Sequence, residues 1–383
     1  MPLESQDILR AILDLARWAP SGDNTQPWRF EVVNERHVVV HGFDTREHCV
    51  YDLDGHASEQ SLGALLETMA IAASVRGWSM RSTRRGDAPL GRPTFDVHFK
   101  PDPRLKADPL AASIESRSVQ RRAMSARRLT AQEKQALEAA VAPHYRVVWR
   151  EDFTQRLDMA RLLSAFAKVR LTMREAYLVH REIIEWNARF SVDKVPDQAL
   201  GADRMTVKMM RFVLGSWGRV RFFNRWLAGT VAPRLQMDLI PGLACGAHFA
   251  LVAPREPHMV DEFVAAGRAM QRFWLAVTRQ GLNLQPAMTP LIFARYLREG
   301  RSFTAQADVH ANAVHAAERL QALLGVQEVQ RCVFMGRIGA GPAAQSRSIR
   351  QPLQQLEVSG AATRTNQPMS PHGNLQSMSK VAG

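Results

Sequence analysis

Apolar residues recur at every third or fourth position in five stretches of the chain, a spacing typical of amphipathic helices. The stretches are 6–18, 59–77, 154–189, 260–281 and 304–324. Shorter runs rich in valine and aromatic residues predict strands. These runs are 28–33, 37–42, 79–83, 94–99, 145–149, 247–252 and 332–338. Thr130 and Glu133 have the spacing of a capping box, which predicts a further helix start.

Helices and strands alternate twice along the chain, which predicts an α+β fold with two similar halves. Pro101, Pro103 and Pro109 mark the connector between these halves. Beyond residue 358 the chain is rich in Ser, Gly, Asn, Pro and Gln, and large apolar residues become rare. This composition predicts a disordered tail over 359–383.

The composition is that of an ordinary globular protein, because 46% of the 383 residues are apolar and 23% are charged. Three widely separated cysteines, Cys49, Cys245 and Cys332, argue against a disulfide framework. The first residues are polar and acidic, without the apolar core of a signal peptide. No apolar run reaches the ~18 residues of a membrane-spanning helix. We therefore expect a cytoplasmic protein that is not integral to a membrane.

The net charge of +13 is concentrated in two windows. Residues 117–128 contain five arginines and no acid, and residues 204–234 contain seven basic side chains and no acid. A non-specific nucleic-acid binder spreads its positive charge over a whole face, so nucleic acid is the least favoured partner. Concentrated arginine favours recognition of an anion, because one guanidinium donates to two oxygens of a phosphate. A solvated basic surface is the alternative.

Several common chemical signatures are absent from the sequence. It contains no Walker A motif, no HExxH and no CxxC. Residues 336–341, GRIGAG, lack the GxGxxG spacing and precede no helical pattern, so a Rossmann dinucleotide site is poorly supported. His41, His98 and His248 fall within strand patterns, and we expect no metal site.

One segment is specific enough to suggest a family. Residues 19–30, APSGDNTQPWRF, closely resemble the helix–turn–strand signature of FMN-dependent nitroreductases. Residues 117–122, RSVQRR, are similar to the family's Arg-rich motif for the FMN phosphate and ring. Two further segments resemble the family's isoalloxazine-edge segment and its basic C-terminal phosphate motif, namely 281–286 (GLNLQP) and 346–353 (SRSIRQPL). The resemblance spans most of the chain outside about 155–240 and the tail.

The order of these motifs resembles a double-length, fused branch of the family, which includes mycobacterial stress-induced members with a lid over FMN. In the ordinary family two subunits dimerise, and both touch each FMN. Here the first half has the Asn24 loop without an Arg motif, and the second has the Arg motif without the loop. The resemblance implies a nitroreductase-like fold duplicated in one chain, an α/β sandwich of antiparallel-rich sheets flanked by helices. The implied parts are 1–112, 113–358 with a lid-like insertion at about 190–240, and the tail.

The resemblance also implies one composite FMN site between the halves, with no indispensable catalytic side chain, because the flavin itself carries out the hydride chemistry. Arg117, Arg121, Arg347 and Arg350 would neutralise the phosphate. Loop residues and main-chain N–H groups would contact the ring and the ribityl chain. The implied FMN-binding residues are Pro20, Ser21, Gly22, Asn24, Gln26, Arg117, Ser118, Val119, Arg121, Pro286, Met288, Thr289, Arg347 and Arg350.

The implied activity is two-electron transfer between flavin N5 and a small organic substrate, with NADH and NADPH as candidate electron donors. The family often has an acidic residue where Met288 falls, which leaves the handling of nicotinamide open. The alternative is a non-catalytic protein that stores FMN beneath a lid. The internal pseudo-dimer would act as a monomer or form a further homodimer.

The basic segment 204–234 has no counterpart in a minimal nitroreductase. It interleaves arginine with aromatic residues, namely Phe212, Trp217, Phe222, Phe223 and Trp226. Three interpretations remain open: a lid over the flavin, an interfacial membrane helix, or buried core. Gly215 and Gly218 interrupt a long amphipathic helix, which argues against the membrane interpretation. Resemblance to the lidded branch favours a lid.

Overall fold

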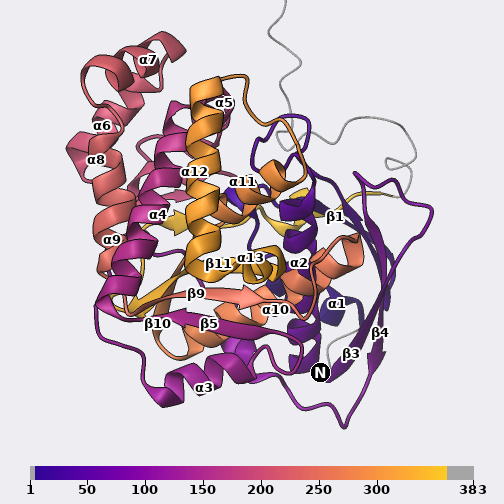
Figure 1. Cartoon of the computed structure of the whole chain (residues 1–383). Coiled ribbons are helices and arrows are strands. Elements are labelled where there is room, and N and C mark those ends of the chain that lie inside the picture. Colours follow the sequence, from indigo (N-terminus) through magenta and orange to yellow (C-terminus); the bar gives the residue numbers. More distant parts are fainter. Residues whose placement is uncertain (1–4, 360–383) are drawn as a thin grey trace, which may run out of the picture.

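Two four-stranded antiparallel sheets form the framework of the protein, in a computed structural model that describes residues 5–359 (Figure 1). The first sheet has the spatial order β1 (Trp28–Asn34), β2 (His37–Gly42), β4 (Thr94–Pro101) and β3 (Trp78–Arg84). The second has the order β5 (Arg146–Arg150), β9 (Ala247–Val252), β11 (Cys332–Ala340) and β10 (Leu282–Pro286). When the strands of each sheet are counted along the chain, both sheets have the order first, second, fourth, third. The same connectivity therefore occurs twice.

Each sheet also has helices at equivalent places. Helix α1 (Ser5–Ala16) precedes the first sheet, and α3 (Ala131–Ala139) precedes the second. The predicted capping box is present at the start of α3. Helices α2 (His56–Val75) and α10 (Val260–Arg279) connect the second and third strands of their sheets. The mixed α+β class predicted from the sequence is confirmed.

Helices α2 and α10 cross at very short range, and this crossing joins the two sheets. A Cβ atom on Gly63 would lie 2.0 Å from the carbonyl oxygen of Val264, and one on Gly267 would lie 2.0 Å from that of Gln60. Only glycine permits such an approach of two backbones. Buried polar contacts add to the crossing, since Gln271 donates to Thr68 Oγ1 at 2.9 Å.

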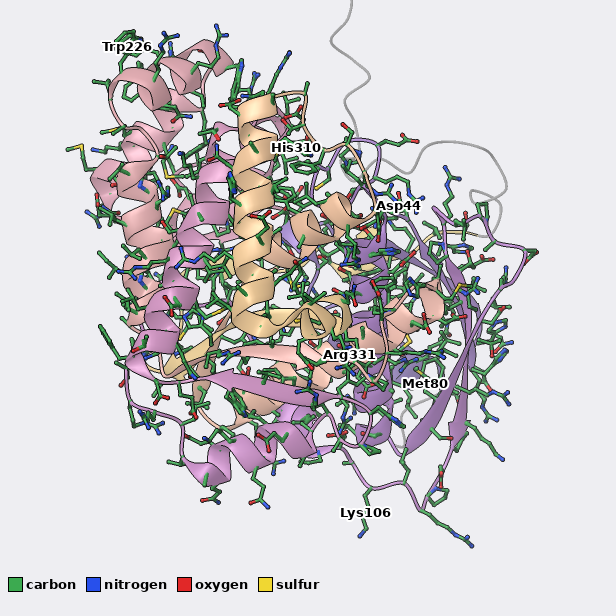
Figure 2. All side chains as sticks on the ribbon, in the orientation of Figure 1. Asp44, Met80, Lys106, Trp226, His310 and Arg331 are labelled. Carbon is green, nitrogen blue, oxygen red and sulfur yellow. The ribbon has the colours of Figure 1, made fainter. Side chains whose placement is uncertain are left out.

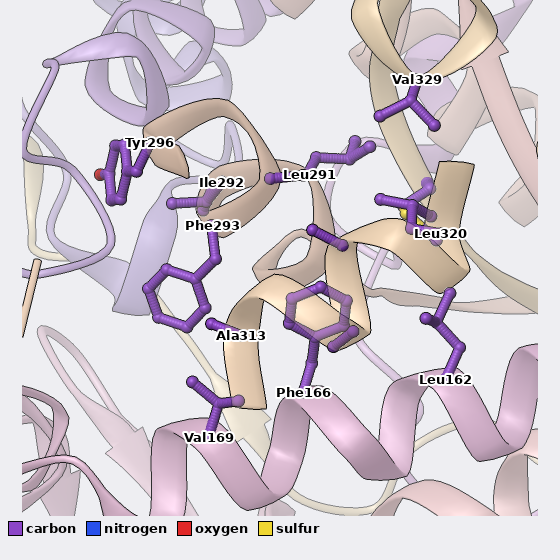
Figure 3. Packing of buried hydrophobic residues seen from close by; sticks show 14 of the residues in the cluster. Leu162, Phe166, Val169, Leu291, Ile292, Phe293, Tyr296, Ala313, Leu320 and Val329 are labelled. Atoms are coloured by element: carbon purple, nitrogen blue, oxygen red, sulfur yellow. The ribbon is translucent and has the colours of Figure 1, made fainter. Parts of the chain in front are cut away.

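Three large hydrophobic clusters fill most of the interior of the described chain, and a fourth, small one is formed by Ile184, Val195 and Leu200. One lies between α1, α2 and the first sheet, and a second lies between α10 and the second sheet. The third joins α4 (Phe153–Thr172), α11 (Thr289–Arg298) and α12 (Ala307–Leu324) on the other side of the second sheet. Figure 3 shows Phe166 and Leu162 of α4 in this cluster with Ala313 and Leu320 of α12. The second sheet is thus covered on both faces.

Smaller elements complete the chain. The short helices are η1 (Gly22–Asn24), η2 (Pro109–Ser113), η3 (Asp197–Ala199), α13 (Val326–Arg331) and α14 (Leu353–Leu356), and the short strands are β6 (Ile184–Glu185), β7 (Phe190–Ser191), β8 (Val195–Pro196) and β12 (Arg347–Ser348). The insertion contains α6 (Arg204–Val213), α7 (Trp217–Trp226), α8 (Val231–Arg234), a π-helical turn (Leu235–Leu239) and α9 (Ile240–Leu243). Figure 1 shows α6 and α7 projecting beyond the two sheets.

All seven predicted strands are present, and their ends agree within two residues. The single helix predicted over 154–189 is wrong, because the chain breaks at Met173 into α4 and α5 (Arg174–Ile183). Met173 is extended and fully buried. Gln306 bonds both sides of the break, accepting from the Arg174 amide and donating to the Thr172 carbonyl. A distant side chain therefore replaces the helical hydrogen bonds that the break removes.

Strand β10 and helix α11 have no counterpart among the predicted elements, although the motif 281–286 covers the strand. Of the predicted tail, only Ser359 falls within the described residues. Across residues 5–359, none of the helices combines the length and the apolar character needed to cross a membrane.

The helix crossing makes a prediction about stability. Gly63→Ala and Gly267→Ala should each lower the free energy of unfolding by about 1–3 kcal/mol, because the added methyl groups force the helices apart. Gly86→Ala is the matched control, since a Cβ atom there meets nothing within 4 Å. Urea denaturation followed by circular dichroism measures the difference. Equal stability of Gly63→Ala and Gly86→Ala would contradict the importance of this crossing.

Candidate functional site

A cavity of about 680 Å³ brings together segments from distant parts of the sequence. One wall comes from the loop after α1, and others come from residues 117–121, the start of α11 and residues 347–350. The cavity contains thirteen of the fourteen residues implied by the sequence, namely Pro20, Ser21, Gly22, Asn24, Arg117, Ser118, Val119, Arg121, Pro286, Met288, Thr289, Arg347 and Arg350. The four separate motifs therefore surround one space.

The loop after α1 has an unusual backbone. Asp23, Asn24 and Gln26 all have positive φ angles, between 50° and 65°. Such conformations cost energy in residues other than glycine and persist only where surrounding contacts enforce them. Those contacts are present: the Gln26 amide donates to Ser21 Oγ at 2.9 Å, and Asn24 Nδ2 donates to the Ile349 carbonyl at 3.1 Å.

Gln26 is the implied residue that does not line the cavity. It is fully buried behind the loop. Its Nε2 donates to the carbonyl of Val192 at 2.9 Å, and its Oε1 accepts from the Gln351 amide at 2.9 Å. Gln26 therefore ties the loop to two remote segments, and its side chain positions the loop.

Two buried arginines, Arg117 and Arg350, and the half-buried Arg347 form a cationic group beside the loop. Arg117 and Arg350 are 5% and 7% exposed. Burial lowers the pKa of Arg117 well below its ordinary value, and the charges of Arg350 and Arg347 lower it further. Burial lowers the pKa of Arg350 to about 9, with Arg347 contributing. Their hydrogen bonds go to backbone carbonyls, including Trp18 for Arg117 and Ala19 for Arg350.

The ion pairs found among residues 5–359 include none for Arg117, Arg347 or Arg350. Buried charges of one sign are costly unless an opposite charge joins them. The group is therefore suited to a bound anion. Arg121 lies in a different electrostatic setting, because the charges acting on it are Asp23 and Arg170.

Several buried polar atoms at the cavity lack hydrogen-bond partners within the described part of the chain. They are Asn24 Oδ1, Arg117 Nε, Trp274 Nε1 and Gln285 Oε1. The Arg117 guanidinium also lies 4.5 Å from the centre of the Trp274 ring. Unsatisfied buried donors and acceptors are rare in proteins, so several at one cavity indicate a polar ligand.

Sequence reasoning missed a tyrosine–histidine pair at the cavity. Tyr51 and His180 lie 2.9 Å apart between Oη and Nε2, and both line the cavity. Burial, assisted by Arg170, lowers the pKa of His180 to about 3, so the imidazole is neutral when it shares this hydrogen bond with the tyrosine hydroxyl. Burial raises the pKa of Tyr51. The pair comes from a loop and from α5, and neither position carries a recognisable motif.

The insertion forms another wall of the cavity. Inward-facing apolar side chains of α6 and α7 line it, among them Met210, Val213, Val220 and Phe223. Arg170 of α4 and Asp238 of the insertion approach to 3.4 Å across the interior. A largely apolar cover therefore lies opposite the polar loop and the arginines.

Two other groups of polar side chains have internal partners. His37, Asp96 and His98 have potential metal-ligand atoms within 4.8 Å of one another. Both oxygens of Asp96, however, accept hydrogen bonds from Arg85, at 2.7 and 2.9 Å. A second hollow, of about 710 Å³, contains Arg272, which pairs with both Glu67 and Asp108 at 2.9 Å.

Parts of the chain are similar to known proteins. Residues 4–65 match the model of the nitroreductase family, and this stretch includes the Asn24 loop. Two curated relatives are each 31% identical over 192 residues, the putative NAD(P)H nitroreductases MT3217 and Rv3131 of Mycobacterium tuberculosis strains. The match spans 50% of this chain and 54%, about half, of each relative. The chain is therefore similar to nitroreductases over these parts of its length.

Two solved nitroreductase structures are also similar. A nitroreductase-like family protein from Bacillus cereus is 13% identical with a TM-score of 0.31, covering 65% of this chain and 94% of its own. The FMN-dependent nitroreductase NfnB from Mycobacterium smegmatis, solved with NADPH, is 16% identical with a TM-score of 0.33. This match covers 63% of the present chain and 94% of NfnB.

A half-buried and a buried histidine, His180 and His248, predict acid sensitivity. The pKa values of His180 and His248 are lowered by burial to about 3 and about 4, from 6.5. The unfolded chain therefore binds more protons than the folded chain below pH 6.5, and the free energy of unfolding should fall as pH drops toward 4. His180→Gln and His248→Gln should flatten this slope in pH-dependent urea denaturation. The exposed His315→Gln is the control, and an unchanged slope in both the His180 and the His248 variant would contradict the assignment.

Proposed function

We propose that the chain is an FMN-dependent oxidoreductase whose cavity holds one FMN between the two sheets. The observation that carries this proposal is the group of buried and half-buried arginines without carboxylate partners, which opens onto the same cavity as the family's loop. A doubly charged phosphate is the kind of anion that compensates several guanidinium groups at once. Named relatives of the chain are putative NAD(P)H nitroreductases, which supports a redox activity.

Arg117, Arg347 and Arg350 would hold the phosphate. Ser21 and Asn24 would bind polar atoms of the ring and ribityl chain, and the unpartnered Asn24 Oδ1 is suited to accept from one of them. The Met288 and Thr289 amides stand at the start of α11 and need acceptors outside the helix, as amides of a first helical turn do. They would donate to the electron-rich edge of the ring.

The remaining implied residues would shape the site. Pro20, Gly22, Ser118, Val119 and Pro286 line the walls. A Cβ atom on Gly22 would meet nothing within 4 Å, so the loop faces open space at this point. Arg121 would act away from the phosphate group, near Asp23. Gln26 would hold the loop in its strained form.

Flavin accepts and releases a hydride equivalent at its ring, and the protein supplies binding, orientation and exclusion of water. The inward faces of α6 and α7 would exclude water from the cavity and limit it to small or flat organic substrates. Tyr51 and the neutral His180 would present a hydroxyl and an imidazole to whatever occupies the adjoining space. No side-chain acid or base is required for the transfer itself.

We also propose that the chain is a fused pseudo-dimer, with halves 1–112 and 113–358 that share this site. The repeated strand order and the reciprocal helix crossing at Gly63 and Gly267 support the duplication. The first part supplies the Asn24 loop, and the second supplies the arginines. A single composite site then suffices for function.

The phosphate assignment makes a binding prediction. Arg117→Ala and Arg350→Ala should each weaken FMN binding by roughly 10–100-fold, because each removes charge-assisted hydrogen bonds to the phosphate. Binding of riboflavin, which lacks the phosphate, should change little. Quenching of flavin fluorescence measures both affinities. The exposed Arg122→Ala is the matched control, and equal affinity of the unaltered chain for FMN and riboflavin would refute the phosphate site.

The redox assignment is tested by reduction of the bound flavin. Anaerobic addition of NADH or NADPH to the FMN-loaded chain should bleach the flavin absorbance. The insertion that covers the cavity favours storage of FMN as the second candidate function. Bleaching by dithionite but by neither nicotinamide would support storage and reject the oxidoreductase.

A further inference from the structure

Exposed apolar side chains are concentrated on the insertion. Of the twenty large apolar side chains that are exposed within residues 5–359, nine lie between Met205 and Ile240. Met205 and Trp226 are 70% and 67% exposed. Figure 2 shows Trp226 at the end of the insertion farthest from the two sheets. Clusters of this kind on a folded protein usually mark a surface that another molecule covers.

Basic side chains surround these apolar groups. Between residues 204 and 237 the chain has seven basic residues and no acid. Those exposed on α6 and α7 are Arg204, Lys208, Arg211, Arg219, Arg221 and Arg225. We call the exposed apolar and basic side chains of α6, α7 and Leu227 the tip surface. Its charge complements a polyanionic partner.

The two helices have distinct faces. Thr206 of α6 and Val220 of α7 are buried toward the cavity side. The opposite faces carry Phe212 and Phe222, which are 53% and 55% exposed. Each helix has ten residues, and the two helices are in contact, because Arg219 donates to the Phe212 carbonyl at 3.1 Å. Gly215 lies between the two helices. The chain therefore forms two short helices with exposed apolar faces here, in place of one long amphipathic helix.

Arginine and aromatic groups are interleaved at contact distance on the tip surface. The Arg219 guanidinium lies 4.3 Å from the centre of the Phe212 ring, and that of Arg225 lies 5.3 Å from the Trp226 ring. Such pairs are suited to a boundary between an apolar and an aqueous phase, where the aromatic rings and aliphatic chains are buried and the guanidinium groups stay hydrated. The headgroup region of a bilayer is a boundary of this type.

Other polyanions and a second copy fit less well. Nucleic acid accounts for the arginines and the aromatic rings, but it gives Met205 and Leu227 no apolar environment. A second copy would bring two equally basic surfaces together, which repel each other. An anionic bilayer satisfies both the charge and the apolar groups.

We infer that the tip surface docks the protein on the surface of a membrane that contains anionic lipids, with Phe222 and Trp226 entering the headgroup region and the basic side chains binding the headgroups. This docking is peripheral, and it uses side chains other than those proposed to bind FMN. It requires no spanning segment.

The test is co-sedimentation of the full-length protein with vesicles. Binding should be strong with mixed phosphatidylcholine and phosphatidylglycerol vesicles, weak with phosphatidylcholine alone, and reduced by salt. Phe222→Ser with Trp226→Ser should weaken binding by roughly tenfold or more. Arg221→Gln with Arg225→Gln should weaken it by roughly tenfold.

Matched controls separate the surface from general charge or hydrophobicity. Phe153→Ser with Leu90→Ser removes similarly exposed apolar groups elsewhere, and Arg10→Gln with Arg76→Gln removes the same charge elsewhere. Both control pairs should bind vesicles like the unaltered chain. Near-ultraviolet circular dichroism verifies that each variant is folded.

Three results would overturn the inference. They are equal binding to neutral and anionic vesicles, loss of binding in the control pairs as large as in the tip variants, and retention of vesicle binding in both tip variants. Preferential binding of duplex DNA over anionic vesicles would assign the surface to nucleic acid instead. Dimerisation abolished by the tip variants, without vesicle binding, would assign it to a second copy.

Discussion

The close crossing of α2 and α10 is the constraint on which the arrangement of the site depends. Because Gly63 and Gly267 allow the two backbones to touch, the sheets that these helices connect are held at one distance and one angle. The loop after α1 packs with the first of these layers, and Arg117 stacks on Trp274 of α10. A wider crossing would separate the loop from the arginines, and the shared cavity would open.

Electrostatic cost is the physical basis of the proposed anion site. Arg117, Arg347 and Arg350 approach one another with backbone carbonyls as their hydrogen-bond partners. Carbonyl dipoles solvate a guanidinium partly but do not neutralise it. The strained loop at Asn24 stores further free energy beside the same space. In the proposed function, a bound phosphate would neutralise the arginines, and polar groups beside it would bind to the loop.

The strands and the motif segments could be predicted from the sequence because their signals are local. The apolar runs within 37–42 and 247–252 and the Gln-Pro-Trp turn at Trp28 require no knowledge of distant residues. The break at Met173 could not be predicted, because its compensation comes from Gln306. The separation of Arg121 from Arg117 and the pairing of Tyr51 with His180 likewise depend on how remote segments meet.

Helices α6 and α7 contact the cavity on one face and present the tip surface on the other. Binding in the cavity and docking of the tip surface are therefore linked through the same two helices. Their inward side chains bound the cavity, while their outward side chains form the tip surface. A partner that fixes the position of these helices also fixes the cavity wall, and a ligand that orders the wall also orders the outer face. Linkage makes this effect reciprocal, so occupancy of the cavity and docking of the tip surface change each other's free energy by the same amount. The coupling is favourable if the helices take the same position in the docked and the ligand-bound protein, and unfavourable if these positions differ.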